Sequence, residues 1–100
     1  WDDPAYAVSL AIKAAGYTQE DMFVVGIDGN ERNIKMIAAN NTAVVATILQ
    51  PFGDSATKAA ELIQKIVVEG NSPEEVIGAV RVIYMDAPLI TSANAQDYLK

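Results

Sequence analysis

Four residues carry side chains that could recognise a ligand: two follow predicted buried strands, and two precede the first predicted helix, where they would follow a strand that lies before this chain. They are Asp28, Gln50, Trp1 and Asp2. Asp28 comes directly after the apolar run 22–27, and Gln50 comes directly after the apolar run 43–49. Spacings of 27 and 22 residues separate Trp1, Asp28 and Gln50, and each is the length of one strand–helix unit. Because parallel strands end at the same edge of a sheet, we expect these residues to converge on one ligand.

The chemistry of these side chains suits a polyhydroxylated ligand. The Asp28 carboxylate can accept charge-assisted hydrogen bonds from two hydroxyl groups. The Gln50 amide can donate and accept at once, and the Trp1 indole offers a flat apolar face for the C–H groups of a sugar ring. The sequence contains no Cys and no His, which excludes thiol chemistry, a Ser-His-Asp triad and thiolate or imidazole metal ligands. We therefore expect a binding site without a cofactor or metal, and not an enzyme.

Each candidate also has a purely structural interpretation. Asp28 precedes a predicted helix, so it could simply cap that helix, which is the better explanation for an isolated Asp-Gly pair. Gln50 could be an ordinary loop residue, and Trp1 could be a core residue that truncation of the chain has left exposed. Asp3, which precedes a proline, has the signature of a helix N-cap.

Composition and charge exclude several kinds of partner. The net charge is −6, and the seven Lys and Arg residues are scattered, so the chain has no basic stripe of the kind that binds nucleic acid. No apolar run approaches the ~18 residues of a membrane span, so we expect no direct membrane insertion in this segment. The chain opens on Trp1 and not on a methionine. We expect it to be a piece of a longer protein.

Apolar periodicity predicts alternating helices and strands. Helices are predicted at 4–15, within 29–40 and at 54–68, strands at 22–27, 43–49 and 80–85, and a tail from residue 87. The strands are apolar without alternation, which is typical of strands buried on both faces of a parallel sheet. This order predicts an α/β fold with a parallel sheet flanked by helices. Three strands are few for an independent domain of this class, so we expect an incomplete fold that is poorly stable alone.

Three phrases in the chain together resemble one protein family. They are "VVGIDGNE", "VATILQP" and "PLITSANAQDY". In this order and at these spacings they resemble the C-terminal portion of type I periplasmic sugar-binding proteins, such as the ribose- and galactose-binding proteins of ABC importers. The resemblance implies a three-layer α/β sandwich in two lobes that close around a monosaccharide or polyol. It places residues 1–50 in the C-terminal lobe, residues 51–86 in the N-terminal lobe, and residues 87–100 back in the C-terminal lobe.

The resemblance also implies roles for the four candidates. Asp28 matches the family aspartate that accepts sugar hydroxyls, and Gln50 matches a polar residue at the hinge crossing that contacts the sugar. Trp1 stands where many relatives have an asparagine, so its contact would be stacking in place of a hydrogen bond. Asp2 matches the aspartate that follows and is expected at the ligand site, where it holds the loop. The implied partner is the membrane permease of an ABC importer, and the implied location is periplasmic or extracellular, with or without a lipid anchor.

Three other functions remain open from the sequence. The same fold serves as the effector-binding core of lactose-repressor-type transcription regulators. A receiver-type or flavodoxin-like domain would use Asp28 as a phosphoacceptor or metal ligand, but no lysine follows 43–49 or 80–85 as that function needs. The chain could also be a fragment without activity.

Overall fold

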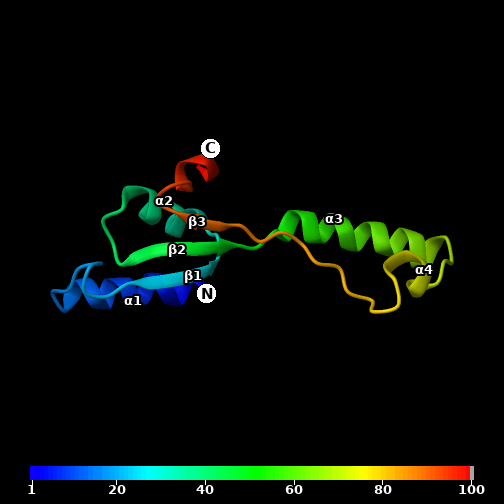
Figure 1. Ribbon diagram of the computed structural model, residues 1–100, viewed down its shortest axis with the longest axis horizontal. Coiled ribbons are helices and arrows are strands. Elements are labelled where there is room, and N and C mark those ends of the chain that lie inside the picture. Colours follow the sequence, from blue (N-terminus) through cyan, green and yellow to red (C-terminus); the bar gives the residue numbers. More distant parts are fainter. Residues whose placement is uncertain (100) are drawn as a thin grey trace. The chain divides into compact units, whose positions relative to one another are not determined.

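In the computed structural model, which describes residues 1–99, the chain divides into two units (Figure 1). The first unit contains Trp1–Gln50 and the segment from Ala87 onward, and the second contains Pro51–Asp86. These bounds coincide with the three segments that the resemblance distributes between lobes. The assignment of each unit to a particular lobe stays a prediction.

The first unit is a small mixed sheet with helices packed against it. Its elements are α1 (Asp2–Ala14), β1 (Val24–Asp28), α2 (Glu31–Ala39), β2 (Val44–Leu49), β3 (Leu89–Thr91) and a 3-10 helix, η2 (Ala95–Tyr98). The strand order is β1-β2-β3, with β1 parallel to β2 and β2 antiparallel to β3. The predicted α/β class, with helices flanking a sheet, is confirmed. The prediction of a purely parallel sheet is wrong, because the third strand runs in the opposite direction.

The predicted strand at 80–85 is also wrong. Residues 81–88 belong to no ladder, and Figure 1 draws this stretch as chain without an arrow. The third strand comes instead from the tail, where Ile90 pairs with Thr47 of β2. An apolar run becomes a strand only where a neighbouring strand can pair its N–H and C=O groups. Within the described chain, 80–85 has no such neighbour, whereas the tail lies along the free edge of β2.

The core of the first unit lies between α2, β2 and the tail. Its buried cluster consists of Ile34, Ile37, Val44, Ile90 and Ala95. On β1, Gly26 is buried, but Val25 and Ile27 remain 50% and 38% exposed. The prediction that this strand is buried on both faces is therefore wrong for the described chain, because none of its elements covers the face of Val25 and Ile27.

The first helix begins two residues earlier than predicted. The proline pattern favoured Asp3 as the N-cap, but Trp1 occupies that position, and its side chain makes no capping bond. Asp3 lies inside the first turn, where its negative charge interacts favourably with the positive end of the helix dipole. It also forms an ion pair with Arg32, whose guanidinium stacks 4.0 Å from the centroid of the Tyr6 ring. These contacts join the exposed sides of α1 and α2.

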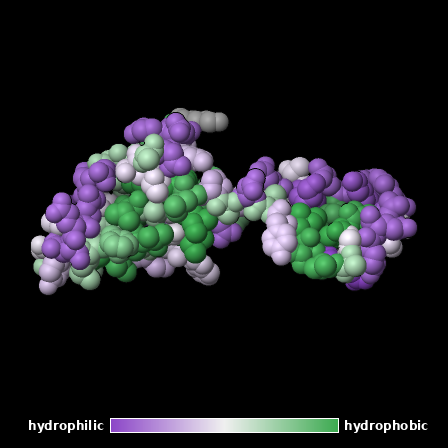
Figure 2. Space-filling view, in the orientation of Figure 1, coloured by the Kyte–Doolittle hydropathy of each residue, from purple (hydrophilic) through white to green (hydrophobic). Residues whose placement is uncertain are grey.

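The second unit is helical and has no buried core. It contains α3 (Phe52–Ile63), a π-helical turn (Gln64–Val68) and α4 (Pro73–Ile77), so the predicted helix at 54–68 is present and starts slightly earlier. A capping box begins α4, and the Ser72 backbone N–H that donates to the Glu75 carboxylate holds the pKa of Glu75 below its usual value. No residue between Pro51 and Asp86 is buried. Figure 2 shows apolar atoms on its surface, and its exposed large apolar residues are Phe52, Ile63, Val67, Val68, Val80, Val82, Ile83 and Tyr84.

The position of the third strand can be tested by truncating its side chains. Ile90→Ala is expected to lower the free energy of unfolding by ~2–5 kcal/mol, because Ile90 is fully buried in the core. Leu89→Ala and Val82→Ala, at half-exposed positions, are expected to change it by less than ~1 kcal/mol. Urea unfolding of the full-length protein measures all three. A larger loss for Val82→Ala than for Ile90→Ala would support a strand at 80–85 instead.

Candidate ligand-binding site

Asp28 and Gln50 lie side by side at the carboxyl edge of the two parallel strands. Asp28 is the last residue of β1 and pairs in register with Leu49, the last residue of β2. The Gln50 backbone N–H donates to the Asp28 carbonyl at 3.2 Å. The Gln50 side-chain Nε2 lies 3.5 Å from Asp28 Oδ1, a long contact for a hydrogen bond. The structure therefore brings together two candidates that are 22 residues apart in the sequence.

The start of α1 reaches the same edge. The backbone N–H of Asp2 points at Asp28 Oδ2 over 3.4 Å, again a long contact. Trp1 precedes it as the N-cap residue and is 78% exposed in the described chain. The edge thus gathers a carboxylate, an amide and the residue that carries an exposed indole.

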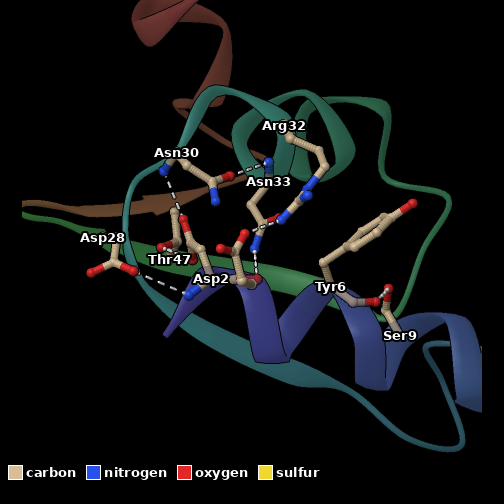
Figure 3. A network of polar contacts seen from close by, with 9 residues as sticks. Asp2, Tyr6, Ser9, Asp28, Asn30, Arg32, Asn33 and Thr47 are labelled. Carbon is tan, nitrogen blue, oxygen red and sulfur yellow. Dashed lines mark hydrogen bonds and ion pairs between the residues drawn. The ribbon is translucent and has the colours of Figure 1, made fainter.

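Beneath this edge, Asp2 is fully buried and forms the centre of a polar network (Figure 3). Its Oδ1 accepts from the Thr47 hydroxyl at 2.7 Å, and its Oδ2 accepts from the Asn30 backbone N–H at 2.7 Å. Its backbone carbonyl accepts from Asn33 Nδ2 at 2.9 Å. One residue therefore ties α1 to β2, to the β1–α2 loop and to α2. These bonds suit the loop-holding role, while a direct contact between Asp2 and a ligand stays a prediction.

Asp28 does not cap the helix that follows it. The N-cap of α2 is Asn30, whose side-chain oxygen accepts from the Asn33 backbone N–H at 2.9 Å. In Figure 3, the Asp28 side chain lies at the margin of the network, joined to it by one dashed line. The structural interpretation of Asp28 as a cap is therefore wrong, and among residues 1–99 its half-buried carboxylate has only two contacts, both long.

The backbone at Asp28 is in an unusual conformation. Its φ is +134°, in a region that side-chain-bearing residues rarely adopt and that costs on the order of 1–3 kcal/mol. Gly29 follows with φ +73°, and a Cβ there would lie 2.9 Å from the Leu49 Cα. Strand β1 thus ends in a sharp turn that only a glycine can complete, and the turn sets the direction of the Asp28 side chain.

Residues that the sequence analysis did not single out build the support of the site. Thr47 stands in an apolar strand, and Asn33 on the apolar stripe of a helix, and both are fully buried. A polar residue in such a position is the signal that could have marked them, because buried polar groups need partners. Asn30 carried a recognisable signal, a capping residue directly before a helix.

Two cavities border the first unit. One of about 550 Å³ is lined by the carboxyl-terminal ends of α1 and α2 and the loops after them, including Lys13, Tyr17, Met36 and Thr42. The other, of about 400 Å³, borders Gly29 and Leu49 beside the Asp28 turn. Asp28 itself lines neither of these two cavities.

The part of the chain that the structure describes contains no group of three or more carboxylate, thiol or imidazole side chains placed to hold a metal ion. Nor does it contain a helix that is both long and apolar enough to cross a membrane.

No family model matches the chain. It is 35% identical over 96 residues to a D-apiose import binding protein of Paraburkholderia graminis. The match covers 94% of this chain but 27% of the relative, so the chain spans about a quarter of the length of that curated protein. The relative is named as a binding protein and not as an enzyme, in agreement with the sequence prediction that the chain is not an enzyme.

The close packing of Asp2 against β1 can be tested at Gly26. A Cβ at Gly26 would lie 2.0 Å from Asp2 Oδ1, so Gly26→Ala must displace a buried carboxylate. We expect a loss of at least ~2 kcal/mol in the free energy of unfolding, in the range of overpacking and broken buried networks. Gly53→Ala is the matched control, because a Cβ there meets nothing within 4 Å and alanine favours a helix. Equal stabilities of the two variants in urea would show that Asp2 is not packed against Gly26.

Proposed function

We propose that this chain is part of a solute-binding protein that captures a monosaccharide or polyol between two lobes for an ABC importer. The observation that carries the proposal is the position of the Asp28 carboxylate and the weakness of its contacts. It lies at the carboxyl edge of two parallel strands, in a costly backbone conformation, and receives only two long contacts from the residues that the structure describes. A carboxylate has about four acceptor sites, so Asp28 keeps most of its capacity for ligand hydroxyls.

The contrast between the two aspartates supports this role. Asp2 accepts two bonds of 2.7 Å and is fully enclosed, as expected of a structural carboxylate. Asp28 has neither short bonds nor full burial. Charge-assisted hydrogen bonds to a ligand, worth ~1.5–3 kcal/mol each, would offset the backbone cost that Asp28 imposes on the folded protein.

Gln50 and Trp1 complete the proposed site. Gln50 is the last residue of the first unit and directly precedes the second, which supports its place at a crossing between lobes. Its amide can donate to one ligand oxygen and accept from a neighbouring hydroxyl. The exposed indole of Trp1 would pack against the C–H face of a ring, which favours a cyclic sugar over a linear polyol.

The similarity to an import binding protein supports the transport setting. The partner that we propose is the membrane permease of an ABC importer, and the location is the periplasm or the cell surface. No observation in the structure favours the transcription-regulator alternative.

The ligand role of Asp28 can be separated from its structural role by three substitutions in the full-length protein. Asp28→Ala is expected to weaken sugar binding at least ~100-fold, because two charge-assisted bonds are lost. Asp28→Gly is expected to weaken binding equally but to raise stability by up to ~1 kcal/mol, because glycine adopts φ +134° without strain. Isothermal titration with D-apiose, D-ribose, D-xylose and D-galactose, together with urea unfolding, measures both properties.

Asn30→Ala is the matched control for these variants. It removes the true cap of α2 and is expected to cost ~1 kcal/mol of stability while leaving sugar affinity within ~3-fold. Normal sugar binding by Asp28→Ala would exclude Asp28 as a ligand contact. A wild-type protein that is folded and binds none of the sugars would contradict the proposed function.

A further inference from the structure

We propose that Thr47 is a positioning residue for the carboxylate of Asp28. The inference rests on the proposed function, in which Asp28 binds the ligand. Thr47 lies in the middle of β2 and is fully buried, so it has no surface to offer to a ligand. Any effect of Thr47 on binding must therefore pass through the groups that its side chain contacts.

The Thr47 hydroxyl uses both its donor and its acceptor capacity. It donates to Asp2 Oδ1 at 2.7 Å and accepts from the Gly29 backbone N–H at 3.3 Å. One contact holds the start of α1, and the other holds the peptide group directly after Asp28. A single oxygen atom thus links the two segments that meet at the candidate site.

Asp28 needs this support because its own conformation is unfavourable. Its backbone has φ +134°, and within residues 1–99 its side chain receives only contacts of 3.4 and 3.5 Å. Conformations of this kind persist only where the surroundings fix them. The hydrogen bond from the Gly29 N–H to the Thr47 hydroxyl restrains the backbone directly after the strained residue.

Neighbouring groups pack closely around the turn at Gly29. On one side of Gly29, the Leu49 side chain lies so near that an added Cβ would be 2.4 Å from its Cδ1. Gly26, the register partner of Thr47, has no side chain, which leaves room for the Thr47 hydroxyl and the Asp2 carboxylate to meet. The turn is therefore packed closely against Leu49 and bonded to the Thr47 hydroxyl, and both contacts restrict the residue that follows Asp28.

The test compares Thr47→Val and Thr47→Ser in the full-length protein. Valine keeps the shape of threonine but leaves Gly29 N–H and Asp2 Oδ1 without this partner, so we expect sugar affinity to fall at least ~10-fold. Serine keeps the hydroxyl, and we expect affinity within ~3-fold of wild type. Thr42→Val is the matched control, because the Thr42 hydroxyl is buried without a hydrogen-bond partner among residues 1–99. Equal affinity of Thr47→Val and wild type would overturn the proposal.

A double-mutant cycle distinguishes positioning from a general loss of structure. If Thr47 acts through Asp28, Thr47→Val should weaken binding much less in an Asp28→Asn background, where the positioned charge is already absent. An undiminished loss in that background would show that Thr47 acts on the fold as a whole, and would overturn the proposal.

A measurement without ligand separates this inference from the proposed function. Hydrogen exchange at the Gly29 amide should be at least ~10-fold faster in Thr47→Val than in Thr42→Val, because its acceptor is gone. Unchanged exchange at Gly29 would overturn the positioning role whatever the affinities are. Faster exchange would support the positioning of the turn by Thr47. If the protein then bound none of the sugars, the proposed function would be refuted.

Discussion

The buried carboxylate of Asp2 is the interaction on which the rest of the candidate site depends. A carboxylate taken out of water is costly unless hydrogen bonds satisfy it, and here Thr47 and the Asn30 backbone supply bonds of 2.7 Å. To make these bonds, the start of α1, the middle of β2 and the β1–α2 loop must occupy fixed positions. Gly26 makes room for this carboxylate, because any side chain there would occupy the space of Asp2 Oδ1.

In the function that we propose, one aspartate has a structural role and another binds the ligand. Asp2 has its hydrogen-bonding capacity satisfied internally, whereas Asp28 is held in a strained turn with weak contacts. This arrangement is typical of functional positions, where a residue keeps a conformation that stability alone would not favour. The support is built on strands and helix starts, and the loop is bonded to Thr47 and packed closely against Leu49.

Both units expose apolar side chains that folded proteins ordinarily bury. Val25 and Ile27 of β1 lie on a sheet face that no described element covers, and the second unit has no buried residue at all. Burial of apolar area is the main driving force of folding. Within the described chain, the exposed apolar side chains of both units do not contribute this stabilisation. The match to about a quarter of a longer binding protein agrees with this deficit.

The sequence by itself determined the local elements and the residues with binding chemistry. Continuous apolar runs located β1 and β2, apolar periodicity and breaker residues located α1, α2 and α3, and the predicted strand ends identified Asp28 and Gln50. Only the tertiary structure decided that β3 comes from the tail and not from 80–85, because strand pairing depends on which edge is free. It also decided that Asn30 caps α2, and that Thr47 and Asn33 support the site, because these roles depend on contacts between segments distant in sequence.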